Sequence, residues 1–186
     1  MMRLILASTS PYRKLLLDRL ELPFIQIDPP FEEAAPGSMP VAELVLHNSM
    51  GKAQSVLNQH PDATVIASDQ LVACGDIVLG KPGCAEKARA QLAMLSGKSV
   101  TFLTGLVLLS SGQRHFETIP YTVTFRDLSE REIRNYIEKE KPIDCAGSFK
   151  SEGLGIALFE KMQGDDPTAL IGLPLIRLSQ WLKPLL

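Results

Sequence analysis

Leu4-Ile5-Leu6-Ala7-Ser8-Thr9-Ser10-Pro11-Tyr12-Arg13 joins an apolar run to a polar loop, and a helical pattern follows over residues 14–20. This order predicts a strand, a tight loop and the start of a helix. Ser10 is a favourable N-cap residue, and Pro11 suits the first helical turn. The backbone N–H groups at such a helix start, two hydroxyls and Arg13 can together bind phosphate. The alternative is an ordinary capped helix with a surface arginine.

The composition narrows the class of protein. The chain has 186 residues and a formal net charge of −2, and we predict a single domain over residues 1–186. The mild acidity disfavours a dedicated nucleic-acid-binding protein, which usually carries a basic excess. The three cysteines and three histidines lack zinc-ligand spacing. No apolar run approaches the length of a membrane span. We therefore expect a cytoplasmic protein with neither nucleic acid nor membrane as its partner.

Apolar periodicity alternates between helical and strand patterns along the chain. The pattern predicts an α/β fold, with a mixed central sheet flanked by helices and two lobes around a cleft. Helices are predicted over residues 40–59, 85–95, 129–139 and 174–182. Ser129-Glu130-Arg131-Glu132 is a predicted capping box at the start of the third, and the glycine loop of residues 170–174 opens the last. Strands are predicted over residues 64–67, 100–109 and 119–125, with a hairpin of residues 71–73 and 77–79 around Cys74-Gly75-Asp76. In the first of these helices, positions 42, 46, 50, 53 and 57 form the predicted apolar stripe.

Asp69 follows the buried strand of residues 64–67, where we expect the strand to meet a loop. In open α/β sheets, ligands bind at the carboxyl ends of strands, and Ser8 and Arg13 follow another such end. If the two strands are neighbours, the Asp69 carboxylate faces the predicted phosphate-binding loop. The alternative is a turn residue that is satisfied by local N–H groups.

Four further charged residues are candidates for a site. Glu32-Glu33 lies in a Pro-rich loop, and one of these carboxylates together with Asp69 can hold Mg²⁺. Lys52 lies at the edge of the apolar stripe of its helix, and Lys81 lies in the rigid loop Gly80-Lys81-Pro82. For each position taken alone, a solvated surface charge is the simpler interpretation.

Seven short strings resemble those of the Maf family, in its order and near its spacing. They are Ser8-Thr9-Ser10-Pro11-Tyr12-Arg13, Glu32-Glu33, Lys52-Ala53, Ser68-Asp69-Gln70, Gly80-Lys81-Pro82, Cys145-Ala146-Gly147-Ser148-Phe149 and Ile171-Gly172-Leu173-Pro174. The resemblance spans essentially the whole chain. It implies a nucleoside triphosphate pyrophosphatase whose α/β fold is related to that of the inosine triphosphate pyrophosphatases.

The resemblance also implies roles for individual residues. Asp69 would be the proton acceptor for the water that attacks the α-phosphorus. With Glu33 it would also bind a divalent cation, Mg²⁺ or Mn²⁺. Glu32 replaces the Asp that is common in the family's acidic pair. The residues implied to hold the triphosphate are Ser8, Ser10, Arg13, Lys52 and Lys81.

Among Maf proteins, the chain resembles the YceF-type branch, which acts on 7-methylguanosine triphosphate. The string Ser148-Phe149-Lys150-Ser151-Glu152-Gly153 and Gln70 carry this closer resemblance, while Tyr12 stands where the branch has Trp. Tyr12 can stack on a cationic base, and Gln70 offers both a donor and an acceptor. Glu152 can accept hydrogen bonds from the N1–H and exocyclic amine of guanine. We therefore expect Tyr12, Gln70 and Glu152 to set substrate specificity.

Other functions remain open from the sequence. The substrate can instead be thymidine or uridine triphosphate or a broader set of modified nucleotides, and a nucleotide-binding regulator of cell division is a further alternative. The family resemblance makes a homodimer reasonable. The apolar residues 102–109 and Trp181-Leu182 can serve either such an interface or the core.

Overall fold

The computed structural model describes residues 3–75 and 77–185, and these residues form two compact units. Unit 1 comprises residues 3–70, 103–119 and 166–185, and unit 2 comprises residues 71–75, 77–102 and 120–165. None of the helices in this described part of the chain is both long and apolar enough to cross a membrane.

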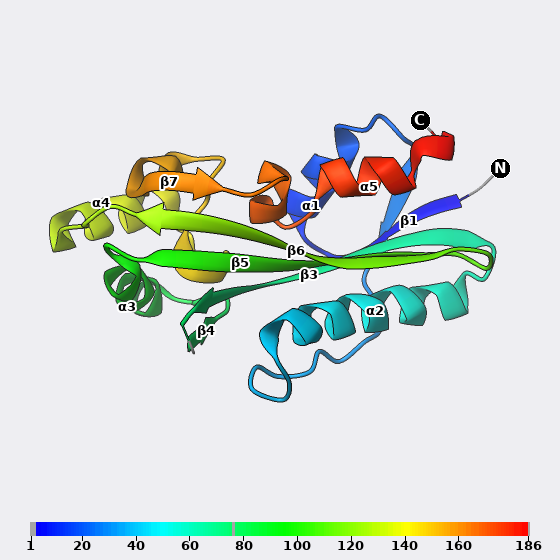
Figure 1. Ribbon diagram of the computed structural model, residues 1–186, viewed down its shortest axis with the longest axis horizontal. Helices are drawn as coiled ribbons and strands as arrows, with labels where there is room; N and C mark the ends of the chain where they lie inside the picture. Colours follow the sequence, from blue (N-terminus) through cyan, green and yellow to red (C-terminus); the bar gives the residue numbers. More distant parts are fainter. Residues whose placement is uncertain (1–2, 76, 186) are drawn as a thin grey trace. The chain divides into compact units, whose positions relative to one another are not determined.

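Helices and strands alternate along the chain, as the sequence predicts (Figure 1). The strands are β1 (Arg3–Ala7), β2 (Phe24–Ile27), β3 (Ala63–Cys74), β4 (Ile77–Leu79), β5 (Ser99–Leu109), β6 (Arg114–Phe125) and β7 (Phe159–Gln163). The helices are α1 (Pro11–Asp18), α2 (Val41–Gln59), α3 (Ala85–Leu95), α4 (Glu130–Glu140) and α5 (Leu175–Trp181), with short 3₁₀ turns at Ala146–Ser148, Leu154–Leu158, Pro167–Ile171 and Lys183–Leu185.

The strands of the described residues form one sheet in the order β2-β1-β3-β5-β6-β7, with β4 paired to β3. The pairs of β1 with β2 and with β3 are parallel, whereas β3 with β4 and β6 with β7 are antiparallel. The predicted α/β class with a mixed sheet is therefore confirmed. The cleft between two lobes stays a prediction.

The segment from β1 to α1 has the predicted strand, loop and helix start. Four of the five β1 residues are buried, and Pro11 is the first residue of α1. Ser10 has extended backbone angles, and its hydroxyl accepts a hydrogen bond from the Arg13 N–H at 3.4 Å. That bond satisfies one of the N–H groups that a helix start leaves without a partner.

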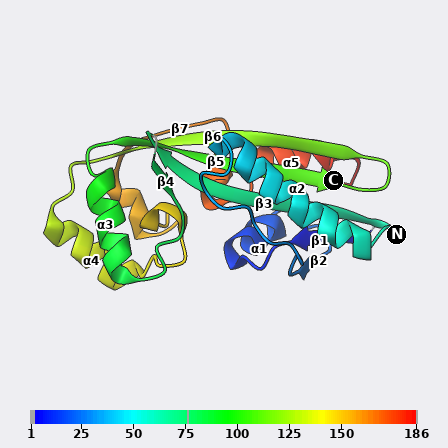
Figure 2. The ribbon, with the colours of Figure 1, turned by 90° about the horizontal axis from the view of Figure 1, so that it is seen from below.

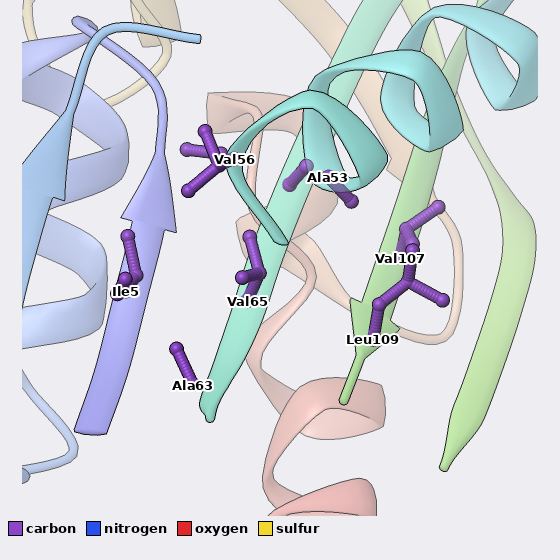
Figure 3. Packing of buried hydrophobic residues seen from close by; sticks show 9 residues of the cluster. Ile5, Ala53, Val56, Ala63, Val65, Val107 and Leu109 are labelled. Carbon is purple, nitrogen blue, oxygen red and sulfur yellow. The ribbon is translucent and has the colours of Figure 1, made fainter. Parts of the chain in front are cut away.

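The core of unit 1 lies between α2 and the sheet (Figure 3). Val56 and Ala53 of α2 pack over Ile5 of β1, Val65 of β3 and Val107 of β5. α1 and α5 lie on the opposite face of the sheet (Figure 1). The small side chain of Ala53 and the absence of one at Gly105 let α2 approach closely, since a Cβ on Gly105 would lie 2.4 Å from the Val45 carbonyl oxygen.

The predicted apolar stripe of α2 is partly wrong. Ala53 is buried, but Ala42 is exposed, and the buried positions of the helix are Leu44, Val45, Asn48, Ser49, Lys52, Ala53 and Val56. Polar residues can be buried on this face because their side chains form hydrogen bonds there. The Ser49 hydroxyl, for example, lies 2.6 Å from the Val45 carbonyl oxygen and 3.1 Å from the Gly105 carbonyl oxygen. Hydrophobic periodicity alone cannot detect such residues.

Strand β3 is much longer than predicted, and this corrects the placement of Asp69. Asp69 lies inside the strand, which continues to Cys74 because Val72 and Ala73 pair with β4. The predicted hairpin is thus confirmed, while Asp76 of its turn lies outside the described residues. Strand β6 likewise begins at Arg114 rather than at Ile119.

Unit 2 contains α3 and α4, which pack side by side (Figure 2). Both were predicted, and α3 has the predicted bounds. The core of unit 2 includes a cluster of edge-to-face aromatic rings with centroids 4.8–5.5 Å apart: Phe102, Phe125, Phe149 and Phe159. The predicted capping box at the start of α4 is confirmed by reciprocal hydrogen bonds between Ser129 and Glu132.

This capping box predicts a pH dependence of stability. Hydrogen bonds from Ser129 and Arg126 hold the pKa of Glu132 at about 2, below its ordinary value of 4.5. A carboxyl group with a depressed pKa stabilises the fold above its unfolded pKa, and this contribution is lost as the pH falls toward the folded value. We therefore expect Glu132→Gln to unfold at lower urea than the unmodified protein at pH 7, with a difference that shrinks as the pH falls from about 5 toward about 2.

Glu138→Gln, on an exposed position of the same helix, is the control for loss of a surface charge. A Glu132→Gln difference that grows toward low pH would contradict this account of the cap.

Candidate functional site

Three of the predicted phosphate-binding residues lie together at the loop between β1 and α1. The buried Ser8 hydroxyl accepts hydrogen bonds from the Ser10 backbone N–H at 3.2 Å and from the Arg13 Nη1 at 3.3 Å. The start of α1 adds further backbone N–H groups and the positive end of the helix dipole. Unit 1 therefore contains a loop with the donors that an anion requires.

The carbonyl oxygen of Gly172 fixes this loop from the C-terminal part of unit 1. It accepts hydrogen bonds from Arg13 Nε and from the Ser68 hydroxyl, both at 2.9 Å. Gly172 ends the 3₁₀ turn Pro167–Ile171 with a φ of +117°, a region that L side chains rarely adopt. The glycine loop that the sequence indicated before the last helix thus orients the guanidinium of Arg13.

The charge state of Arg13 reflects its surroundings. Burial lowers the pKa of its guanidinium from the ordinary value, while the negative charges of Asp69 and Glu33 oppose that shift. An arginine in a protein stays protonated at neutral pH. Arg13 is therefore a cation within the electrostatic field of both carboxylates, which links the phosphate-binding loop to the acidic residues.

Lys52 brings these two carboxylates together. Its Nζ lies 3.2 Å from Asp69 Oδ1 and 2.5 Å from Glu33 Oε1. The side chains of Lys52 and Asp69 are only 7% and 10% exposed, whereas that of Glu33 is 53% exposed. Lys52 is therefore a buried cation and not a solvated surface charge. The two carboxylates beside it compensate for the loss of water around its ammonium group. The structure thus brings together Glu33 and Asp69, predicted as metal ligands, and Lys52, predicted to bind phosphate.

Asn48 belongs to the same cluster, and the sequence analysis missed it. Its Nδ2 lies 3.1 Å from Asp69 Oδ2, and its Oδ1 accepts a hydrogen bond from the Ala34 N–H at 2.9 Å. The available signal was its position four residues before Lys52, which places both on one face of the helix. An asparagine and a lysine on a face that the helix buries indicate a polar partner opposite them.

Gln70 is held by the chain itself. Its Nε2 donates to the carbonyl oxygens of Ala169 and Leu170 at 2.7 and 3.1 Å and to the Thr104 hydroxyl at 3.1 Å. Carbonyl oxygens only accept, so these contacts identify the nitrogen end of the amide. Gln70 therefore anchors the 3₁₀ turn Pro167–Ile171. Its contact with a substrate base stays a prediction.

The other predicted site residues have different surroundings. Tyr12 is half-buried on α1, and Glu32 is exposed beside Glu33. Lys81 and Glu152 are exposed residues of unit 2, and their predicted contacts with phosphate and base stay predictions.

The loop that carries Glu152 is anchored on both sides by α4. The Lys150 N–H donates to the Tyr136 hydroxyl at 2.9 Å, and the Leu154 N–H donates to Glu140 Oε2 at 2.8 Å. Burial raises the pKa of Tyr136, so its hydroxyl keeps its proton across the physiological range. These bonds hold both ends of the segment around Glu152.

The described residues contain no group of three or more His, Cys, Asp or Glu side chains arranged to hold a metal ion. Glu33 and Asp69 nevertheless converge on one ammonium nitrogen. Carboxylate oxygens are the donors that Mg²⁺ and Mn²⁺ prefer, and Mg²⁺ commonly takes one or two of them together with substrate phosphate and water. These two residues fit as the protein's ligands for such a cation.

Comparison with known proteins places the chain among named relatives. Residues 3–185 match the family described as Maf-like protein. A 7-methyl-GTP pyrophosphatase of Alkalilimnicola ehrlichii is 51% identical over 181 residues, covering 96% of this chain and 91% of the relative. One of Pseudomonas aeruginosa is 50% identical over 181 residues, covering 96% and 94%. The Ham1 protein of Staphylococcus aureus has a similar fold, with a TM-score of 0.53, 14% identity and 98% of each chain covered.

The contacts of Gln70 predict a loss of stability when its amide is replaced. Gln70→Glu places a carboxylate oxygen against the carbonyls of Ala169 and Leu170, which then lack their donor. We expect a decrease of about 1–3 kcal/mol in the free energy of unfolding, measured by urea titration at pH 7. The matched control is Gln54→Glu on the exposed face of α2, with an expected change within about 0.5 kcal/mol. Equal stability of the two variants would contradict the anchoring role.

Proposed function

The chain belongs to the Maf family, and from that premise we propose that it is a hydrolase that cleaves nucleoside triphosphates between the α- and β-phosphates. The products are a nucleoside monophosphate and pyrophosphate. One observation carries the proposal. A buried carboxylate, Asp69, is paired with Lys52 in the same unit as a loop of phosphate-type donors. The pyrophosphatase names of the relatives support the same reaction.

In this mechanism Asp69 takes a proton from the attacking water. The water oxygen bonds to the α-phosphorus, and the bond from that phosphorus to the bridging oxygen breaks, so pyrophosphate leaves with the electron pair. Asp69 suits this role because Lys52 and Asn48 hold its two oxygens from α2. A carboxylate with a fixed orientation aligns the water with little further loss of entropy.

The remaining residues stabilise the charge of the triphosphate. Ser8, Ser10 and the start of α1 supply neutral donors, and Arg13 supplies a fixed cation. We assign Lys52 and Lys81 the same charge-balancing role. A divalent cation held by Glu33 and Asp69 would neutralise phosphate oxygens and make the phosphorus more electrophilic.

We further propose 7-methylguanosine triphosphate as the substrate, in accord with the names of the relatives. Its methylated base carries a delocalised positive charge. Stacking on Tyr12 is worth about 1–2 kcal/mol where the contact is desolvated, and the Glu152 carboxylate complements both the charge and the donor edge of the base. We assign Gln70 to the same specificity set through its place beside Asp69.

The chain would work as one functional domain, since the family match runs over residues 3–185. We place its action in the cytoplasm, where nucleoside triphosphates are abundant, against modified nucleotides. A homodimer is the proposed assembly, by analogy with the family.

The reaction predicts a defined product pattern. With Mg²⁺ or Mn²⁺, we expect pyrophosphate release from 7-methylguanosine triphosphate to exceed that from guanosine, thymidine and uridine triphosphates. Asp69→Asn removes the proton acceptor and should lower kcat by about 100- to 10,000-fold. Asp62→Asn, an exposed residue before the same strand, is the control and should retain activity.

Faster turnover of thymidine or uridine triphosphate would keep the reaction and overturn the proposed substrate. Binding of nucleotide without turnover by the unmodified protein would overturn the reaction and favour a nucleotide-binding regulator.

Glu152 provides the test of base recognition. Glu152→Gln removes the negative charge and places an amide donor against a donor edge of guanine. We expect the preference in kcat/KM for 7-methylguanosine over thymidine triphosphate to fall by about tenfold, the effect of roughly 1.4 kcal/mol. Glu160→Gln, an exposed charge of the same unit, is the matched control. An unchanged preference in Glu152→Gln would remove Glu152 from the specificity set.

A further inference from the structure

Asn48 contacts Ala34 as well as Asp69, and the proposed reaction uses only the contact with Asp69. Asn48 is 2% exposed, and its side chain uses both ends of its amide. Nδ2 donates to Asp69 Oδ2 at 3.1 Å, and Oδ1 accepts from the Ala34 N–H at 2.9 Å. A weaker contact of 3.4 Å joins Nδ2 to the Ala34 carbonyl. One side chain thus connects β3 to the loop that carries Glu33.

The same two parts of the chain are connected a second time, one helical turn further along α2. Lys52 contacts Asp69 Oδ1 and Glu33 Oε1. The two connections differ in kind. Lys52 binds the Glu33 carboxylate, which is charged and half-exposed, whereas Asn48 binds the backbone of the next residue. A cation that enters this site competes with Lys52 for both carboxylates, but it does not compete for the Ala34 N–H.

We propose that Asn48 is a positioning residue for the reaction: it fixes the Glu33 loop against Asp69 and assigns the two oxygens of Asp69 to different tasks. Asn48 occupies Oδ2, so Oδ1 is the oxygen that serves water or cation when Lys52 yields its contact. The inference rests on the proposed function.

The position of Asn48 predicts which kinetic constant it controls. The phosphate-type donors of unit 1 lie at Ser8, Ser10 and Arg13, and Asn48 makes none of their contacts. Removing it should leave nucleotide binding largely intact while it misplaces Asp69. Small displacements of a reacting group have large effects on kcat, because the aligned geometry supplies much of the rate.

Two variants separate the two ends of the amide. Asn48→Ala removes all three contacts. Asn48→Asp keeps an oxygen for the Ala34 N–H but has no Nδ2 donor, so it loses the contact with Asp69 Oδ2 and the weaker contact with the Ala34 carbonyl. Asn58→Ala, an exposed asparagine of the same helix, is the matched control. Urea unfolding of each full-length variant verifies that it is folded, and Asn48→Asp decides the question if Asn48→Ala does not fold.

Two measurements test the proposal. In steady-state kinetics with saturating Mg²⁺, we expect both Asn48 variants to lower kcat by about 10- to 100-fold and to change KM by less than about threefold. In amide hydrogen exchange by NMR, the Ala34 N–H should exchange about tenfold faster or more in Asn48→Ala and remain protected in Asn48→Asp. The exchange measurement needs neither cation nor substrate.

The outcomes separate this inference from the proposed function. If the unmodified protein releases no pyrophosphate, the proposed function fails, and Ala34 exchange alone then decides whether Asn48 fixes the Glu33 loop. Unchanged exchange in Asn48→Ala overturns the inference. So does a folded Asn48 variant with the unmodified kcat, or one that raises KM and leaves kcat unchanged.

Discussion

The buried ion pair between Lys52 and Asp69 is the interaction on which the arrangement of unit 1 depends. An ammonium group removed from water needs an opposite charge and hydrogen-bond partners, or its burial costs several kcal/mol. Lys52 lies on α2 and Asp69 on β3, so the pair requires the helix to lie directly over the strand, close enough for the two side chains to meet. The absence of a side chain at Gly105 allows this approach, and the apolar contacts of Ala53 and Val56 stabilise it. Packing and electrostatics thus specify the same position of the helix.

Local signals in the sequence predict the parts of the fold that depend on neighbouring residues. The N-cap at Ser10 and the capping box at Ser129 were correct because each depends on groups within one helical turn. The end of β3 was wrong for the opposite reason. Ser68 and Gln70 resemble a strand terminus by composition, but they bind carbonyls about a hundred positions later in the chain. No local pattern reveals such partners.

The candidate site shows the same division. Motif resemblance indicated Glu33, Lys52 and Asp69 together, although their sequence spacing alone does not bring them into contact. It did not indicate Asn48, which is a single amide side chain outside the seven strings. It included Gly172 but gave no role for its carbonyl, because a backbone group has no side-chain signature. Both support residues that the sequence did identify. The sequence therefore predicted the residues assigned to the chemistry better than those that hold them in place.

The charges of this cluster explain why we expect a cation to accompany the substrate. Arg13 and Lys52 are the cations near Asp69, and Glu33 and Asp69 offset them, so the four residues carry no net charge. Such a cluster can orient a triphosphate, but it cannot neutralise one. A divalent ion that arrives with the phosphates supplies the missing positive charge and finds carboxylate oxygens beside Lys52. The pairing with Lys52 also lets the Asp69 carboxylate remain buried without substrate, because it already lies beside a cation.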